Sequence, residues 1–145
     1  MPTVAATRML RAEPDEVWRV VSDPERLPAW WPGVKRVEEA EPHAWTKVLT
    51  SERGKTVRAD YTLEESEVPS RLVWRHEVDE SPFEGILRES LTEFDLEPVD
   101  GGTQVTVTVR HRPRGLARLG QVQLRMAAKR QVEAALAGLA ELVEG

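Results

Sequence analysis

The sequence predicts an α+β protein in which one long C-terminal helix covers one face of an antiparallel sheet. Polar and apolar residues alternate with a period of two through consecutive segments between residues 34 and 111, as in strands with one buried and one wet face. From about Gln121 to Glu144, apolar residues instead recur at spacings of three and four, which indicates a helix with a broad apolar stripe. This helix can supply the cover that the dry face of the sheet needs.

Length and composition restrict the class of protein. The 145 residues fit one domain spanning residues 1–145, and 40% hydrophobic with 31% charged residues favours a soluble globular protein. The absence of cysteine excludes disulfides, thiolate nucleophiles and cysteine metal sites. The start does not resemble a signal peptide, and no window approaches the ~18 apolar residues of a membrane span. We therefore expect a cytoplasmic protein without a transmembrane segment.

The first third of the chain predicts one strand and then short helices. The strand covers Thr3–Arg11, and a helix follows over Glu13–Ser22 because Pro14 suits the first helical position and acidic residues come next. Pro24 and Pro28 confine the residues after this helix to short helical turns. The chain then enters the sheet.

Six strands are predicted in the middle of the chain, with a tight turn at Asp100-Gly101-Gly102 before the last of them. They are Val34–Glu41, Ala44–Ser51, Lys55–Glu65, Ser70–Asp79, Glu84–Glu97 and Thr103–His111. Glycines weaken the start of the helical pattern that follows, so Arg114–Gly120 is expected to be kinked or separate from the long helix.

The strand Glu84–Glu97 allows two registers. Counting back from its end places Arg88 and Ser90 on the inner face of the sheet, whereas the leucines of the segment have the opposite parity and would carry Glu89 inward instead. A β-bulge near Leu91 would reconcile the two patterns. A buried charge at this strand would need a partner or a ligand.

Short motifs and the order of the elements carry a resemblance to a known family. The motifs are Glu16-Val17-Trp18, Asp23-Pro24, Trp31-Pro32 and Gly101-Gly102-Thr103. With one strand, two helices, six strands and a final helix, the chain resembles the START/Bet v 1-like (SRPBCC) superfamily, in its polyketide cyclase/dehydrase and lipid-transport group. The resemblance implies a helix-grip fold, in which a seven-stranded antiparallel sheet curves around the long helix and leaves a cavity. It also implies a small hydrophobic ligand that is polyketide-, lipid- or isoprenoid-like.

Three side chains of the alternating strands would line such a cavity, namely Tyr61, Trp74 and His76. Histidine titrates near neutrality, so His76 could move a proton, or it could be a core histidine satisfied by a hydroxyl such as that of Tyr61. Tyr61 could likewise present its hydroxyl to a ligand or be an ordinary core residue. The resemblance implies an enzymatic alternative, an aromatase/cyclase-like site in which these two residues and Arg88 or Glu89 hold a poly-β-carbonyl chain.

Further residues complete the predicted ligand-binding set. Two neighbouring tryptophans on a helix point about 100° apart, so we expect only one of Trp30 and Trp31 in the core. The resemblance places this region at the mouth of the cavity, and Trp31 is therefore included. His111 has the inward parity of its strand and lies near the mouth, and Met126 of the C-terminal helix is included as well. Ser90 and the charged residues beside it are the remaining candidates.

No motif indicates a cofactor. The histidines His43, His76 and His111 are scattered and lack clustered carboxylates, so no metal site is expected. There is no phosphate-binding glycine loop and no nucleophile elbow. We expect neither a cofactor nor a nucleic-acid partner.

Charge is unevenly distributed along the chain. Between Arg110 and Val132 there are seven basic residues and no acidic one, whereas the other positions hold 13 basic and 25 acidic residues. The segment Arg110–Arg130 could attract an acidic partner or an anionic surface, or it could be a solvated flank. The resemblance implies a third alternative beside a binding protein and a cyclase, namely a co-chaperone-like interaction module with this segment as its docking surface.

Overall fold

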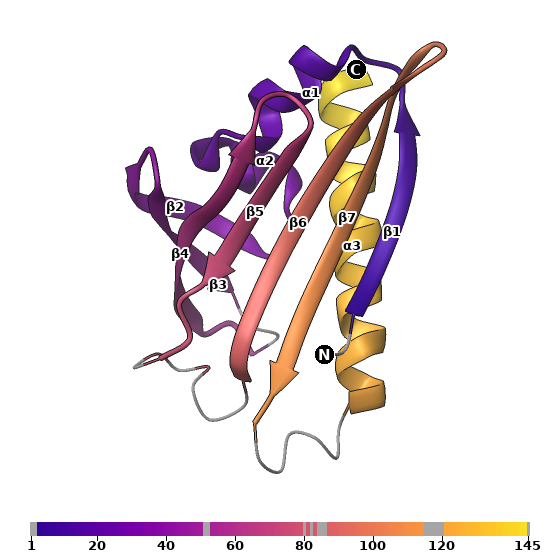
Figure 1. Ribbon diagram of the computed structural model, residues 1–145. Coiled ribbons are helices and arrows are strands. Elements are labelled where there is room, and N and C mark those ends of the chain that lie inside the picture. The colour runs from indigo at the N-terminus through magenta and orange to yellow at the C-terminus, as the bar shows by residue number, and fades with distance from the viewer. Residues whose placement is uncertain are drawn as a thin grey trace.

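Seven strands form one antiparallel sheet in the order β1-β7-β6-β5-β4-β3-β2 (Figure 1). The computed structural model describes residues 3–50, 53–79, 81, 83, 87–114 and 121–144. The strands are β1 (Thr3–Leu10), β2 (Val34–Glu41), β3 (Ala44–Thr50), β4 (Thr56–Glu67), β5 (Arg71–His76), β6 (Leu87–Val99) and β7 (Gly102–Pro113). The predicted fold class, a curved antiparallel sheet with a long C-terminal helix, is confirmed.

The helices follow the predicted order as well. They are α1 (Pro14–Val21), the 3-10 turn η1 (Pro24–Arg26), α2 (Leu27–Trp30) and α3 (Gln121–Glu144). Pro14 opens α1, and the carboxylate of Asp23 accepts a hydrogen bond from the backbone N–H of Glu25 at 3.1 Å, which caps η1. None of the helices of the described residues is long and apolar enough to cross a membrane.

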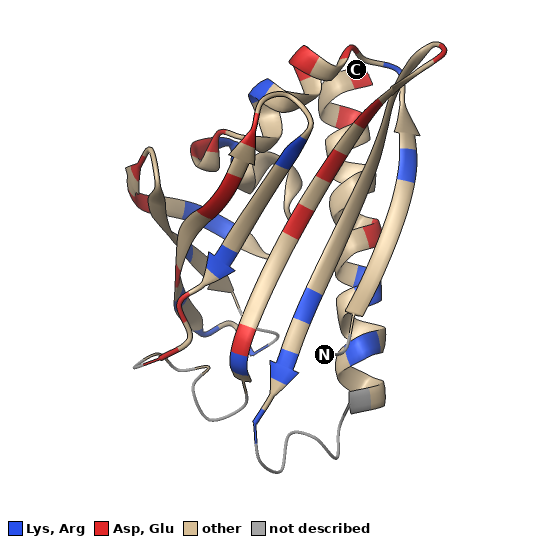
Figure 2. Ribbon diagram, in the orientation of Figure 1, with Lys and Arg blue, Asp and Glu red and all other residues tan. Residues whose placement is uncertain are grey.

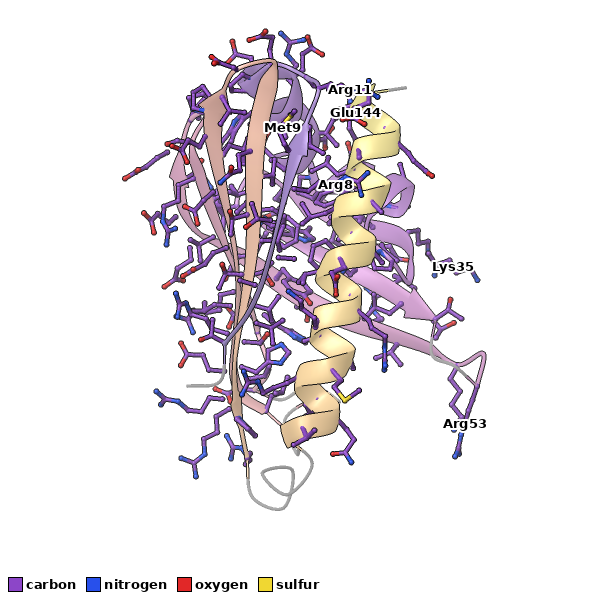
Figure 3. All side chains as sticks on the ribbon, turned by 90° about the vertical axis from the view of Figure 1, so that its right-hand side faces the viewer. Arg8, Met9, Arg11, Lys35, Arg53 and Glu144 are labelled. Carbon is purple, nitrogen blue, oxygen red and sulfur yellow. The ribbon has the colours of Figure 1, made fainter. Side chains whose placement is uncertain are left out.

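The long helix α3 lies along one face of the sheet, where it packs mainly on β1, β7 and α2 (Figures 1 and 3). Its buried side chains recur at helical spacing and include Val132, Leu136 and Leu139. The end of α3 is tied to the end of β1, because the backbone N–H of Arg11 donates to the Glu144 carboxylate at 2.7 Å. The apolar stripe thus covers one side of the sheet's inner face.

The limits of most strands differ from the prediction by one to three residues, and β4 and β5 show this clearly. β4 continues to Glu67, and an irregular pairing after Leu63 separates its last residues from the alternating part. β5 ends at His76, three residues earlier than expected. The predicted start of the next strand, 84–86, and most of the segment 114–120 lie outside the described residues.

The register of β6 corrects the expected position of the bulge. The irregularity lies between Leu87 and Glu89 and not near Leu91, which leaves both Leu87 and Ser90 buried. Arg88, between them, is exposed. Glu89 points away from the core and forms an ion pair with Arg75 at 3.2 Å. The structure therefore places neither charged side chain on the inner face.

The expectation that only one of the paired tryptophans enters the core is wrong. Trp30 and Trp31 are both buried, with ring centroids 5.6 Å apart in an edge-to-face arrangement. Helix α2 ends at Trp30, and Trp31 has extended backbone angles, so the helical angle between neighbouring side chains does not apply. Both rings pack on Phe94 of β6.

Candidate functional site

A lysine lies buried on the inner face of the sheet. Lys47 is in the middle of β3, on the same face as Trp45 and Leu49, and is only 2% exposed. Its partner across the strand pair is Ala59 of β4, whose small side chain leaves space for the longer one. Lysine is rarely fully buried without a paired charge. Within the described part of the chain, however, no hydrogen bond or ion pair of the Lys47 amine is found.

Aromatic rings surround this amine instead. The Lys47 Nζ atom lies 4.2 Å from the ring centroid of Tyr61, 4.4 Å from that of Trp31 and 4.8 Å from that of Trp74. The faces of such rings attract a cation, and most strongly where water is excluded. We refer to Lys47, these three rings and the adjacent His76 as the lysine cluster.

Burial makes the amine unusually acidic. Removal from water lowers the pKa of Lys47 to about 7, against about 10.4 for a lysine in water. The charged and neutral forms are therefore present in similar amounts at neutral pH. The neutral form carries a lone pair, which makes Lys47 a base or a nucleophile.

His76 and Tyr61 stack on each other beside the lysine. Their ring centroids are 4.7 Å apart at an interplanar angle of 18°, and His76 Nε2 is buried without a hydrogen-bond partner among the residues that the structure describes. The pKa of His76 is lowered to about 4, mainly by burial and in smaller part by the nearby charges of Lys47 and His111. Burial also raises the pKa of Tyr61. Stacking has replaced the hydroxyl–imidazole hydrogen bond considered from the sequence, and both groups are neutral at pH 7.

More rings extend the apolar surface around the lysine cluster. Trp45 stacks parallel to Tyr61 at 6.1 Å, Phe94 contacts Trp74 at 4.7 Å, and Phe83 lies edge-on to His76 at 4.7 Å. The Nε1 atom of Trp45 is buried and has no hydrogen-bond partner in the described part of the chain. The site thus offers flat apolar surfaces with few polar atoms. In the part of the chain that the structure describes, no three acidic or histidine side chains converge to hold a metal.

Two hollows in the surface lie near these residues. One of about 490 Å³ has Trp45 and Tyr61, two residues next to the lysine cluster or within it, in its wall. Its rim is acidic and carries Glu39 and Asp60 among other residues. A much smaller apolar cavity of about 10 Å³ lies between β7 and α3, with His111 in its wall.

The structure brings only part of the predicted ligand-binding set together. Trp31, Tyr61, Trp74 and His76 form the lysine cluster with Lys47. The other predicted residues lie elsewhere. Ser90 is buried opposite His111 on the neighbouring strand. Arg88 is exposed, Glu89 forms an ion pair with Arg75, and Met126 is 54% exposed in a hollow between α3 and β1. Their roles in binding stay predictions.

Lys47 itself was missed from the sequence. The signal was present, because Trp45, Lys47 and Leu49 share one parity in a strand whose neighbours bury that face. A lysine among apolar residues of the same parity is the pattern that identifies such a position.

Comparison with known proteins assigns the family. The model of the family described as polyketide cyclase / dehydrase and lipid transport matches residues 1–144. The chain belongs to this family. The match confirms the resemblance to the START-like superfamily noted in the sequence. No curated protein sequence matches the chain.

Several solved structures share the fold. The Zhui aromatase/cyclase from a Streptomyces species is 17% identical with a TM-score of 0.82, and the match covers 99% of this chain and 93% of that one. A START superfamily protein from Mycobacterium smegmatis is 15% identical with a TM-score of 0.78, covering 98% and 97%. A protein from Thermus thermophilus is 24% identical with a TM-score of 0.78, again covering 98% and 97%. At these identities the likeness establishes the fold that the family shares.

Proposed function

We propose that the protein binds a small, flat, largely apolar molecule with an acidic or carbonyl oxygen at the lysine cluster. The observation that carries this proposal is the buried Lys47 amine, which has rings around it and no acidic partner in the described residues. A ligand oxygen would accept a hydrogen bond from the amine, and the rings would contact the apolar part of the ligand. Polyketide-like molecules combine flat carbon skeletons with such oxygens, so they fit better than simple lipids or isoprenoids.

Energetics favour a functional reason for this lysine. Burying an ionisable group without a partner lowers the stability of the fold, and an apolar side chain of similar length would avoid that cost. Such a destabilising residue is often retained where activity needs it. The family to which the chain belongs, and the aromatase/cyclase among its structural neighbours, support a small-molecule ligand.

A binding measurement on a lysine variant tests the proposal. Wild-type protein is titrated with 2-naphthoate, an aromatic acid, while tryptophan fluorescence is recorded. Lys47→Met should weaken binding about tenfold or more, since it removes a charge-assisted hydrogen bond. The same variant should raise the free energy of unfolding by about 2 kcal/mol, because a partnerless amine leaves the core.

The matched control is Lys35→Met, which removes an exposed lysine that points out into solvent (Figure 3). Lys35→Met should measurably change neither the affinity for 2-naphthoate nor the free energy of unfolding. If 2-naphthoate and neutral naphthalene both fail to bind the folded wild-type protein, the interior is a filled core. That result would favour the interaction module instead.

Catalysis of the cyclase type is the second candidate, favoured by the partnerless Nε2 atom of His76 next to Lys47. In this second proposal, His76 and Lys47 exchange protons with a bound poly-β-carbonyl chain. Arg88 and Glu89 take no part in the reaction. Formation of a cyclised aromatic product from such a chain would distinguish turnover from binding.

An acidic partner at the basic segment and a cytoplasmic location stay predictions of the sequence.

A further inference from the structure

We infer that Lys47 forms a covalent imine with an aldehyde or ketone group of its ligand. The inference rests on the proposed function, since it requires a ligand at the lysine cluster, and it names the ligand class as carbonyl compounds. It gives the buried amine a chemical role beyond donating a hydrogen bond.

The position of Lys47 differs from that of every other lysine in the chain. Lys35, Lys55 and Lys129 are exposed, and the Lys129 amine donates a hydrogen bond to the backbone carbonyl of Ala5 at 2.6 Å. Lys47 alone lies within an apolar interior, and no carboxylate among the described residues holds it in the charged form. An amine that has lost its proton and its water shell is ready to attack a carbonyl carbon.

The bonds that form and break are those of a simple condensation. The lone pair of the neutral Nζ atom attacks the carbonyl carbon, and a carbon–nitrogen bond forms as the π electrons move to oxygen. Both hydrogens of the amine then leave with that oxygen as one water molecule, and a carbon–nitrogen double bond remains. No oxidant or reductant is needed. We assign the relay of a proton from nitrogen to the departing oxygen to the Nε2 atom of His76, which has no hydrogen-bond partner among the described residues.

The surrounding rings favour the product. A protonated imine is a cation at the position of Nζ, which lies between 4.2 and 4.8 Å from the ring centroids of Tyr61, Trp31 and Trp74. Ring faces stabilise such a delocalised cation without the strong hydration that an ammonium ion requires. The same rings exclude bulk water, which slows hydrolysis back to the free amine.

Reductive trapping tests the inference on the intact wild-type protein. The protein is incubated at pH 7 with 2-naphthaldehyde and cyanoborohydride, and the modified residue is located by peptide mass spectrometry. Among the four lysines, we expect the naphthylmethyl group on Lys47. Labelling of Lys35 should be at least about tenfold lower, since an exposed lysine with an ordinary pKa is almost fully protonated at pH 7. An excess of 2-naphthoate should suppress labelling of Lys47 but not of Lys35.

The outcomes separate this inference from the proposed function. If 2-naphthoate binds but Lys47 is not labelled, or if labelling is spread evenly over the lysines and indifferent to 2-naphthoate, the imine is ruled out while binding stands. If neither compound binds, both proposals fall. Because the labelled residue is located in the wild-type chain, the result does not depend on whether a Lys47 variant folds.

Discussion

Lys47 and His76 share one water-poor environment, and the charge of Lys47 makes His76 harder to protonate. Burial is the main reason why the pKa of each side chain is lowered, and the charge of Lys47 lowers the pKa of His76 further. In the unfolded chain both groups regain ordinary values. The free energy of unfolding must therefore depend on pH through these two residues.

His76 should make the protein acid-sensitive. Its pKa is about 4 in the folded state and about 6.5 in the unfolded chain, so between these values the unfolded chain binds a proton that the folded protein does not. The free energy of unfolding then falls as the pH drops from 6.5 to 4, by about 3 kcal/mol from this residue. His76→Phe keeps a ring that can stack on Tyr61 and should remove this part of the loss in urea unfolding at pH 7 and pH 4.5. The exposed His43→Phe is the control and should behave as wild type; equal acid sensitivity in all three proteins would contradict the prediction.

At the residue scale, the sequence predicts which face of the sheet a side chain points to better than it predicts which side chains surround it. Strand parity puts Tyr61, Trp74 and His76 on the inner face, where the structure has them. The cluster around Lys47 could not be predicted in this way, because Trp31 reaches it from the end of α2 and Trp74 from β5. Contacts between segments so far apart in the chain depend on the curvature of the sheet.

At the scale of elements, the errors in the sequence prediction occur where regular geometry ends. The bulge of β6 lies at Arg88 because both Leu87 and Ser90 are buried, and alternation alone could not locate it. Trp31 joins Trp30 in the core because α2 stops between them. The regular parts agree better with the prediction, and α3 has the predicted bounds Gln121–Glu144.

The contact between α2 and α3 places Trp31 over the lysine, and it depends on a glycine. A Cβ atom at Gly138 of α3 would lie 2.5 Å from the backbone oxygen of Trp30, closer than such atoms approach. The helices α2 and α3 can therefore approach this closely only because residue 138 is a glycine without a side chain. The position of Trp31 over Lys47 follows from this close approach.

Gly138→Ala should therefore destabilise the protein although alanine is the better helix former. Helix propensity alone predicts a gain of about 1 kcal/mol, but separating α2 from α3 should lower the free energy of unfolding by about 2 kcal/mol overall. Binding of 2-naphthoate should weaken as well, since Trp31 moves with α2. The neighbouring exposed residue provides the control, because Ala137→Gly should lose about 1 kcal/mol by propensity and leave binding unchanged. A stabilised Gly138→Ala variant would show that the helices adjust freely.

At the scale of the whole molecule, the described residues of the basic segment do not form one continuous charged surface. Arg110 faces the outer side of the sheet and pairs with Glu93 at 3.1 Å, so its charge is already balanced. Arg112, Arg125 and Arg130 are exposed, and basic residues gather where β7 ends and α3 begins (Figure 2). The remainder of the predicted segment, 115–120, lies outside the described residues. Among the described residues, the exposed basic side chains of the segment thus gather toward one end of the molecule.

An acidic partner or an anionic surface should bind at this end in a salt-dependent way. Exposed charges are screened over about 8–10 Å at physiological salt, so association with vesicles containing an anionic lipid should weaken sharply between low and physiological salt. Arg112→Glu with Arg125→Glu should weaken it further in vesicle co-sedimentation, while 2-naphthoate binding at the lysine cluster stays unchanged. Arg8→Glu with Arg53→Glu changes the net charge equally at exposed positions elsewhere and should have a smaller effect. An equal effect of both double variants would mean that net charge alone governs association, and no association at low salt would leave the basic end as a solvated flank.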